Sequence, residues 1–486
     1  MRSKSIKKNT IFNAIKTVSA IIFPLITFPY ASRTLLVENI GKVNFGLSFI
    51  SYFSLIASLG INVYAIRECA KFGDDRVKLS KIASEIFSIN VFTTIFSYTI
   101  LILCLLFYKK IESYRTLIVI QSLSILFTTL GTDWLNTAME DFQYITIRSL
   151  LFQVLSLILL FTFIHKPDDY IKYAAISVIS SSGYNIVNMI YRRKYCDIKF
   201  TLDIDIKKHY LPIIFLFVML LSQTIFNNVD MTMLGIMKGD FEVGIYSTAH
   251  KISNIIAQLV TSVVWVILPR MSVYFGNNDK VAANRLINQL YNFSLTIGLP
   301  IVVGIYMLSS DVIVLFASKS FALSTDVLKI LIITTLLLIL FGSLIGNMVL
   351  LPAKQEKYLM ITCIITAVFN VITNYVLIPC FSAIGAAITT LLSSCLYSML
   401  VLIKGSKLIR IQIITRSMIS SVLGVFAIVI ICNICKNVNL IYIRVFFSVI
   451  FSSIIYFCIQ ILLKNDIVLM LIKPIKKISN YFVNKG

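Results

Sequence analysis

Residues 24–67 read PLITFPYASRTLLVENIGKVNFGLSFISYFSLIASLGINVYAIR, and this stretch decides the fold. Its first part is an apolar helix that contains Pro24 and Pro29. Its second part is an apolar helix rich in small and hydroxyl side chains. Glu38 and Gly41 lie between the two and indicate a turn. Bent apolar helices with polar side chains and a charged turn indicate moving parts within a membrane, since a simple anchor needs none of these features.

The composition of the whole chain also indicates a membrane protein. Of its 486 residues, 58% are hydrophobic and 14% are charged, and the mean hydropathy is +0.88. Soluble domains contain about 25% charged residues, and a helix needs about 20 apolar residues to cross the hydrocarbon. We therefore predict an all-α polytopic membrane protein with fourteen spans, or twelve without the last two: 10–35, 43–66, 82–107, 115–136, 145–164, 170–192, 210–234, 245–268, 287–309, 327–350, 358–378, 383–404, 413–434 and 440–463.

The basic residues predict the orientation of the spans. The net charge is +22, and one alternating set of loops carries most of it, as cytoplasmic loops do. We therefore expect both termini in the cytoplasm, and the charge needs no nucleic acid to explain it. The N-terminus is basic, but the apolar segment that follows is too long for a cleaved signal peptide. The basic loop residues include Arg67, Lys71, Arg76, Lys78, Lys81, Arg192, Arg193, Lys194, Lys199, Lys207, Lys208, Lys404, Lys407, Arg410 and Arg416.

The spacing of four residues predicts an internal repeat. Gly41 begins the second span and Arg67 ends it, 26 positions later. Gly244 and Arg270 bound the eighth span in the same way, 203 positions further along the chain. A repeat of six spans gives two lobes of the same orientation, which is a transporter layout. The predicted parts are an N-terminal lobe at 1–200, a C-terminal lobe at 201–406, and an extra helix pair with a basic tail at 407–486.

Charged residues inside the spans are the candidate functional residues. A charge in hydrocarbon costs at least about 2.5 kcal/mol, so each one needs a partner or a hydrated cavity. Lys251 has Asn254 and Gln258 at helical spacing, which predicts a polar stripe along a cavity wall. Lys16 either extends its amine to the cytoplasmic surface or lines the same path. The remaining three residues are candidates for coupling or for pairing that holds the two lobes together: Asp133, Arg148 and Asp230.

Enzyme motifs are missing from the chain. It has no GxxxxGK[ST] and no HExxH, and no loop is long enough for a catalytic domain outside the membrane. Cys432 and Cys435 form a CxxC inside an apolar helix without a second pair, so we interpret it as a chance occurrence. Asp168 and Asp169 lie in a predicted outer loop, where we interpret them as a helix N-terminal cap and not as a metal site. We predict no metal and no cofactor.

Three segments resemble a known family. FPLITFPYASRTLLVENIGKVNFGLSFISYF resembles the opening of Wzx-type polysaccharide flippases, which belong to the multidrug/oligosaccharidyl-lipid/polysaccharide exporter superfamily. TDWLNTAMEDFQYITIRS resembles the stretch after the fourth span of that family. DMTMLG followed by EVGIYSTAHKI resembles its junction of the seventh and eighth spans. With the order of the spans, the resemblance covers nearly the whole chain.

The resemblance implies two six-helix lobes around a V-shaped cavity that opens to one side at a time. It implies a cargo of oligosaccharide repeat units on undecaprenyl pyrophosphate, passed from the inner to the outer leaflet. A cationic path suits this anionic cargo, and Lys16, Arg33 and Lys251 are the cations we place along it. One departure concerns the first turn, where the family often has Leu-Gly-Pro and this chain has Leu35, Leu36 and Val37. The twelfth span also lacks the acidic residue expected near its middle.

We therefore predict a flippase for lipid-linked saccharide in a bacterial cytoplasmic membrane, working by alternating access, with Pro24 and Pro29 as hinge residues. The resemblance implies coupling to a proton or sodium gradient, and a polysaccharide polymerase and glycosyltransferases as further partners. Three alternatives stay open at this point. They are a flippase for the peptidoglycan precursor, a drug or cation antiporter of the same superfamily, and a polytopic glycosyltransferase or polymerase.

Overall fold

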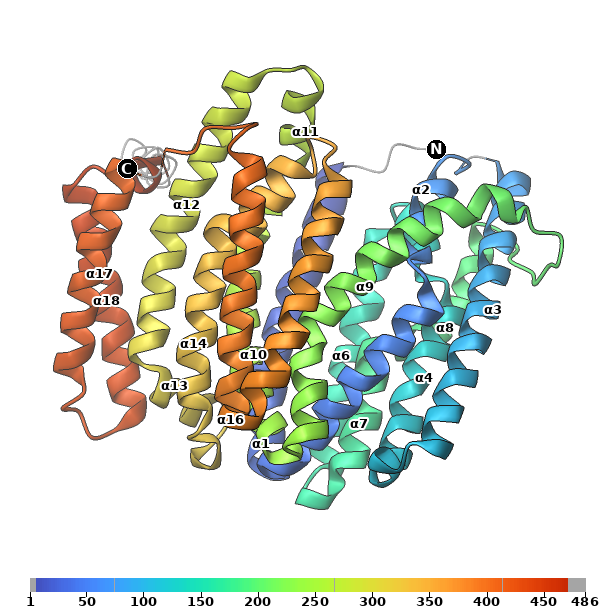
Figure 1. The fold of residues 1–486 in the computed structure, drawn as a ribbon, viewed down its shortest axis with the longest axis horizontal. Coiled ribbons are helices and arrows are strands. Elements are labelled where there is room, and N and C mark those ends of the chain that lie inside the picture. The colour runs from blue at the N-terminus through green and yellow to red at the C-terminus, as the bar shows by residue number, and fades with distance from the viewer. Residues whose placement is uncertain (1–5, 74, 266, 413, 471–486) are drawn as a thin grey trace, which may run out of the picture. The chain divides into compact units, whose positions relative to one another are not determined.

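The computed structural model describes residues 6–73, 75–265, 267–412 and 414–470 (Figure 1). These residues are helical, joined by turns and short extended segments, and contain no strand. The all-α class predicted from the composition is therefore confirmed. The chain divides into two compact units, Met1–Ser247 with Asn374–Ala383, and Thr248–Thr373 with Ile384–Gly486, which we call unit 1 and unit 2.

Unit 1 contains the first nine α-helices and the beginning of the tenth. The predicted N-terminal lobe ends at residue 200, whereas unit 1 continues to Ser247. Unit 1 includes α9 because this helix packs along α1 and α2. The two predicted lobes remain a prediction. The helices are α1 (Ile6–Ser58), α2 (Ile61–Ala70), α3 (Arg76–Phe107), η1 (Lys109–Tyr114), α4 (Arg115–Gly131), α5 (Asp133–Ala138), α6 (Phe142–Phe163), η2 (Pro167–Asp169), α7 (Tyr170–Val178), η3 (Ile179–Gly183), α8 (Tyr184–Tyr191), η4 (Arg192–Lys194), α9 (Ile206–Met237) and α10 (Asp240–Trp265).

Unit 2 contains the rest of α10, most of α16 and the C-terminal helix pair. The pair packs on α12, where a buried polar network joins Asn465 to Thr296, Ser420 and Gln460. The helices are α11 (Leu268–Gly276), α12 (Lys280–Met307), α13 (Ser309–Phe316), η5 (Lys319–Phe321), α14 (Ser324–Leu337), η6 (Leu338–Gly342), α15 (Ser343–Ile345), η7 (Gly346–Leu350), α16 (Glu356–Gly405), α17 (Arg416–Cys435) and α18 (Ile441–Leu462).

Ten helical segments of the described residues are long and apolar enough to cross a membrane. The first and the eighth of these, Ile11–Ala70 and Glu356–Gly405, each contain two of the predicted spans. The predicted spans 170–192 and 245–268 are not among the ten. The count of fourteen therefore remains a prediction, while the apolar, multi-span character of the chain is confirmed.

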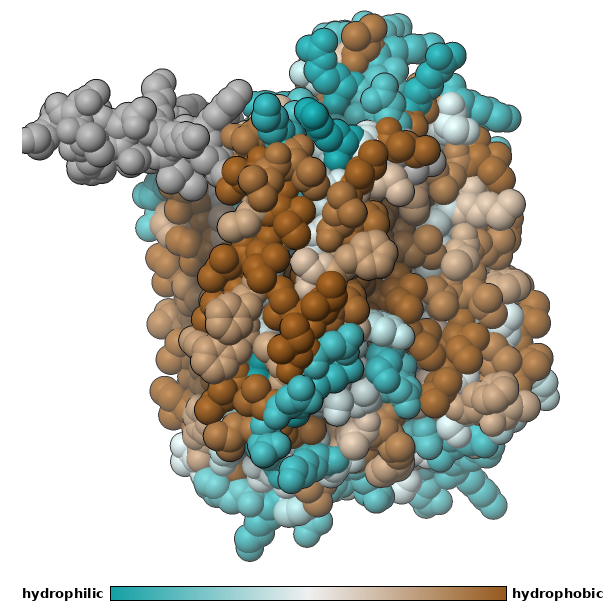
Figure 2. Space-filling model, turned by 90° about the vertical axis from the view of Figure 1, so that its left-hand side faces the viewer, coloured by the Kyte–Doolittle hydropathy of each residue, from teal (hydrophilic) through white to brown (hydrophobic). Residues whose placement is uncertain are grey.

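The side of the protein that carries α17 and α18 has the surface of a membrane-embedded helix pair. Figure 2 shows this side: hydrophobic residues cover most of its middle, and hydrophilic residues gather towards its two ends. Large apolar side chains such as Phe426, Ile430 and Phe446 are more than half exposed there. Exposed apolar surface of this extent is stable in hydrocarbon and unstable in water.

Serine side chains on α3 bind an extended segment that precedes α9. The backbone N–H groups of Asp197, Lys199 and Thr201 donate to the hydroxyls of Ser80, Ser84 and Ser88, at 3.1, 3.0 and 2.8 Å. The two periods match, because four helical residues rise about 6 Å and two extended residues about 6.6 Å. Each bond satisfies a backbone donor that has no strand partner.

Unit 2 contains the same device at equivalent positions. The backbone N–H groups of Arg410 and Gln412 donate to the side-chain oxygens of Asn284 and Asn288 on α12, at 2.9 and 2.7 Å. Asn284 and Asn288 lie 204 positions after Ser80 and Ser84, close to the repeat of 203 predicted from the glycines. This correspondence supports the six-span repeat.

Two glycines of the predicted repeat meet inside unit 1. A Cβ atom on Gly41 would overlap the backbone carbonyl of Asp240, and one on Gly244 would overlap the backbone carbonyl of Val37. Asp240 and Val37 are themselves 203 positions apart, so each side of the contact is the repeat of the other. Both helices therefore approach backbone to backbone, which only glycine permits.

The first sharp turn of α1 is made by one residue, Leu36. Its φ is 65° and its ψ is 178°, while the residues around it stay helical. The predicted turn through Glu38 and Gly41 is wrong, because both residues belong to the second helical part. Leu36 occupies the place where Wzx-type flippases, the family that the chain resembles, often have glycine. The backbone conformation of Leu36 is one that almost only glycine adopts.

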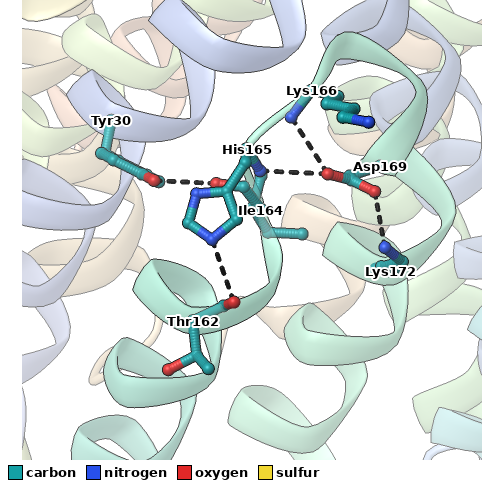
Figure 3. Close-up of polar contacts among 7 residues, drawn as sticks. All are labelled: Tyr30, Thr162, Ile164, His165, Lys166, Asp169 and Lys172. Atoms are coloured by element: carbon teal, nitrogen blue, oxygen red, sulfur yellow. Dashed lines mark hydrogen bonds and ion pairs between the residues drawn. The ribbon is translucent and has the colours of Figure 1, made fainter.

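The loop between α6 and α7 contacts α1 on both sides of Leu36, and Figure 3 shows the contact with Tyr30 and the bonds within the loop. The Tyr30 hydroxyl donates to the carbonyl of Ile164 at 2.7 Å, and the Asn39 amide donates to the carbonyl of Pro167 at 2.8 Å. Asp169 accepts the backbone N–H groups of His165 and Lys166, each at 3.0 Å, and pairs with Lys172 at 2.7 Å.

The same contacts decide the role of Asp169. The Lys172 amine and then the two backbone N–H groups hold the pKa of the Asp169 carboxyl well below its usual range. Asp169 occupies the N-cap position of α7, but its side chain makes no capping bond to that helix and instead binds the N–H of Lys166, the residue that precedes η2. The predicted cap therefore acts on η2 and not on α7.

Replacing Leu36 with glycine should stabilise the protein. A non-glycine residue in this conformation destabilises the folded state by about 1–3 kcal/mol. Glycine removes this strain, but it also raises the conformational entropy of the unfolded chain, which offsets part of the gain in stability. We expect the free energy of unfolding to rise by about 1 kcal/mol, measured by thermal unfolding in detergent. The matched control is Leu47→Gly, a similarly exposed leucine inside the helix, which should lower it by about 1 kcal/mol. If the Leu36→Gly variant is no more stable than the wild type, the backbone conformation of Leu36 is not strained.

Candidate functional site

The second half of α1 presents polar side chains to α9 and α10 within unit 1. The Asn44 amide donates to the hydroxyl of Ser247 at 3.0 Å, and Ser48 donates to the carbonyl of Asn228 at 2.7 Å. The hydroxyls of Tyr52 and Thr232 lie 3.3 Å apart. These three residues of α1, Asn44, Ser48 and Tyr52, are spaced four positions apart, so their side chains share one face of the helix. The hydroxyl-rich pattern of this segment therefore corresponds to one polar helix face.

Asp230 lies at the meeting point of three helices in unit 1. Its side chain is buried, with 2% of its surface exposed. The Tyr246 hydroxyl on α10 donates to Oδ2 at 2.7 Å, and the Asn374 amide on α16 donates to Oδ1 at 2.5 Å. Both of these hydrogen bonds come from neutral groups. Its predicted role in coupling or in pairing remains a prediction.

Asp133 and Arg148 contact each other within unit 1. Arg148 on α6 is buried and donates through Nη2 to the carboxylate of Asp133 at the start of α5. The guanidinium also lies 5.1 Å from the ring centre of Tyr144 and 4.6 Å from that of Tyr184. Stacking of this kind stabilises a desolvated guanidinium. These two residues therefore form a pair inside one unit.

The structure does not bring Lys16 and Arg33 together. Both lie on α1, where Lys16 is half-buried and Arg33 is exposed, about 25 Å apart along the helix axis. Two cations at this separation cannot bind one phosphate group, although both can line a long path. Lys251 lies on α10 in unit 2 and is half-buried, with Asn254 and Gln258 exposed on the same helix. Asn254 and Gln258 of the predicted polar stripe are therefore exposed, and its role as a cavity wall remains a prediction.

Pro24 and Pro29 lie inside α1, which continues through both of them. The only non-helical backbone angles within α1 are those of Leu36. Each proline removes one backbone hydrogen bond and so lowers the resistance of the helix to bending. Their predicted hinge role remains a prediction.

Tyr64, Glu85 and His209 form a buried cluster that the sequence does not bring together. His209 lies between the Tyr64 hydroxyl, 2.7 Å from Nδ1, and the Glu85 carboxylate, 2.9 Å from Nε2. Glu85 falls inside the predicted span 82–107, and this was the signal that could have found it. Among the described residues, no group of three or more His, Cys, Asp or Glu is arranged to hold a metal ion.

The Asp133–Arg148 pair can be tested as a structural element. Asp133→Asn leaves the buried Arg148 guanidinium without its charged partner and should lower the free energy of unfolding by about 3–5 kcal/mol. Arg148→Met leaves the half-buried Asp133 carboxylate without its partner and should lower it by a smaller amount. The double variant should recover at least half of that loss. The control is Arg115→Met, which breaks an exposed pair with Glu112 and should cost about 1 kcal/mol or less. The free energies of unfolding are measured by thermal unfolding in detergent. Single variants as stable as the wild type would contradict a structural role for the pair and favour a role in coupling.

Comparison with known proteins gives family matches that cover most of the chain. Residues 6–275 match the family model described as polysaccharide biosynthesis protein, and residues 212–376 match the MatE family model. A candidate O-antigen transporter of Escherichia coli K12 is 24% identical over 415 residues, which are 83% of this chain and 98% of that protein. The capsular polysaccharide biosynthesis protein CapF of Staphylococcus aureus is 24% identical over 73% of this chain and 88% of its own length.

Solved structures with the same fold are also transporters. The lipid II flippase MurJ, in an inward closed conformation, has a TM-score of 0.74 at 17% identity and covers 94% of this chain and all of its own. An inward-facing multidrug resistance MATE family transporter has a TM-score of 0.61 at 16% identity, over 82% of this chain and 98% of its own. The family match and the transporter relatives, together with this fold, confirm the prediction of a membrane transporter and not an enzyme. The chain belongs to the polysaccharide biosynthesis protein family and is a Wzx-type flippase of the multidrug/oligosaccharidyl-lipid/polysaccharide exporter superfamily.

Proposed function

We propose that this protein moves oligosaccharide repeat units, linked to undecaprenyl pyrophosphate, from the cytoplasmic to the outer leaflet of a bacterial inner membrane. The observation that carries the proposal is the match to the candidate O-antigen transporter, which extends over 98% of that protein. The match of residues 6–275 to the polysaccharide biosynthesis protein family model supports the same proposal. In this orientation both termini lie in the cytoplasm, as the distribution of basic residues favours.

The cations inside the helices suit the proposed cargo. A pyrophosphate is anionic, and Arg and Lys bind phosphate oxygens through charge-assisted hydrogen bonds. Arg33 presents an exposed guanidinium on α1, and Lys16 and Lys251 are both half-buried. Because Lys16 and Arg33 lie far apart along α1, we propose that they contact the anionic groups at different stages of translocation. Asp230 is the proposed binding site for a coupling proton or sodium ion.

A flippase for the peptidoglycan precursor is the second candidate. The TM-score of 0.74 with MurJ favours it, but this likeness concerns the fold. The MatE match over 212–376 belongs to the same superfamily and favours neither cargo. Since both flippases carry a saccharide on a polyprenyl pyrophosphate, their paths need similar cations, and only the accumulated cargo separates them.

Deletion of the gene with complementation tests the proposal. We expect loss of surface polysaccharide and accumulation of lipid-linked repeat units in the cytoplasmic leaflet, measured by extraction and accessibility to periplasm-directed reagents. Re-expression should restore the polysaccharide. Normal polysaccharide together with arrested peptidoglycan synthesis would favour the second candidate, and normal levels of both would refute the function.

The variants Arg33→Ala and Lys251→Ala test the proposed path. A lost charge-assisted hydrogen bond costs about 1.5–3 kcal/mol, so export should fall by about tenfold or more at unchanged membrane levels. The matched control is Lys110→Ala, which removes an exposed cation from a connecting segment and should leave export unchanged. Full export by both path variants would remove these residues from the site.

A further inference from the structure

The helices α3 and α12 begin with the same pattern of residues. Residues 75–84 read DRVKLSKIAS, and residues 279–288 read DKVAANRLIN. Asp75 and Asp279 cap their helices, since each carboxylate accepts a backbone N–H three positions later, at 3.0 and 2.9 Å. Each copy then has an exposed cation, an exposed valine and, five positions after the first cation, a second exposed cation: Arg76, Val77 and Lys81 in unit 1, and Lys280, Val281 and Arg285 in unit 2.

Beside the α3 copy, two segments of unit 1 form the walls of a cationic hollow. The hollow has a volume of about 410 Å³. Its lining contains three cations and one carboxylate, so its side chains carry a net charge of 3 − 1 = +2. A hollow of this charge attracts anions. It is lined by Arg76, Val77, Ser80, Lys81 and Ser84 of α3, and by Asp197 and Lys199 of the extended segment.

The serine bonds between α3 and the extended segment fix the two walls of the hollow. The backbone N–H of Lys199 donates to the hydroxyl of Ser84 at 3.0 Å, and that of Asp197 donates to Ser80 at 3.1 Å. Lys81 lies three positions before Ser84, and residues at this spacing are neighbours on a helix surface. The backbone of Lys199 is therefore held next to the turn of α3 that carries Lys81. Two cations from distant parts of the sequence thus share one site.

The three cations of the hollow differ in how they are paired. Arg76 lies 3.2 Å from the carboxylate of Asp197, and both side chains are more than half exposed, so this ion pair is weak. Among the described residues, the amines of Lys81 and Lys199 have no ion-pair partner. A phosphate group accepts several charge-assisted hydrogen bonds, and amines of this kind donate them. The hollow therefore has the donors that a phosphate needs.

An apolar surface follows the hollow along α3. Phe200, the residue after Lys199, lies against Phe92 with ring centres 5.5 Å apart. Phe92 comes eleven positions after Lys81, which places both on one face of α3. Their separation along the axis is about 16 Å, close to half the hydrocarbon thickness of about 30 Å. Phe92, Phe96 and Phe200 are each at least 45% exposed. This face thus changes from cationic to apolar, as a phospholipid does from its phosphate to its acyl chains.

We propose that Arg76, Lys81 and Lys199 bind the phosphate group of an anionic phospholipid, whose acyl chains lie along Phe92 and Phe96. A free phosphate ion would use the same cations, but only a lipid also covers the apolar face that continues from them. A zwitterionic lipid has its own cation beside the phosphate, so it gains less from the positive charge of the hollow. The lipid site does not depend on the proposed saccharide function.

Chemical labelling of lysine amines tests the proposal on the purified full chain in a neutral detergent. Phosphatidylglycerol, phosphatidylcholine or inorganic phosphate is added, and mass spectrometry gives the acetylation rate of each lysine. Phosphatidylglycerol should slow the labelling of Lys81 and Lys199 at least about fivefold, and the other two additives less than about twofold. Lys78 is the internal control, because it is exposed on the same helix and pairs with Asp75 at 3.1 Å. Its labelling should change less than about twofold.

The variant Ser84→Ala distinguishes a formed site from diffuse attraction. It keeps every charge and removes the acceptor that holds the backbone of Lys199, so phosphatidylglycerol should protect Lys199 less than half as well as in the wild type, about what one lost hydrogen bond allows. The matched control is Ser177→Ala, which removes a hydroxyl that bonds within its own helix, α7. This control should show the wild-type protection.

Equal protection of Lys78 and Lys81 by phosphatidylglycerol would overturn the proposal, because it would indicate diffuse attraction. Protection by phosphatidylcholine equal to that by phosphatidylglycerol would also overturn it, and so would equal protection by inorganic phosphate. The wild-type comparison stands even where Ser84→Ala does not fold. Because the assay contains no saccharide cargo, its failure leaves the proposed function intact. Conversely, failure of complementation by the unaltered gene would refute that function without affecting this site.

Discussion

The close approach of Gly41 and Gly244 is the constraint on which the polar interior of unit 1 depends. Because each glycine lies against the backbone of the other helix, the separation of α1 and α10 leaves no room for a side chain. At this separation Asn44 reaches Ser247, one turn further along the same faces. These partners are again 203 positions apart, so the contact joins equivalent parts of the two repeats. A larger residue at either glycine would separate the polar groups as well as the helices.

Backbone hydrogen bonding explains why the same extended segment occurs twice. A chain that leaves one helix and enters the next without regular structure exposes donors that must be satisfied near a membrane surface. Serines on α3 and asparagines on α12 accept these donors, at positions 204 residues apart. Ser and Asn are different residues, so the repeat is hard to find by identity. In both repeats the accepting side chains are spaced four residues apart along a helix, and the donating backbone N–H groups are spaced two residues apart along an extended chain.

The composition predicted the fold class because the solvent dictates it, and the glycine spacing predicted the repeat because the contact requires glycine. Other features depend on groups that are distant in sequence. Glu85 and His209 are each unremarkable alone, and 124 positions separate them. Leu36 departs from the glycine that the family often has there, yet the structure keeps a glycine-like backbone conformation at this leucine, which the sequence alone does not indicate. The pairing of Asp133 with Arg148 needed the α5–α6 geometry, since neither residue indicates which of several charges it meets.

Two of the carboxylate clusters in unit 1 include a residue of the same helix, α9. His209 lies near the beginning of α9 and Asp230 near its end, about 31 Å apart along the axis, which is close to the thickness of the hydrocarbon. Pro212 lies between the two and removes one backbone hydrogen bond from α9, so a displacement at the His209 end is absorbed at this turn before it reaches Asp230.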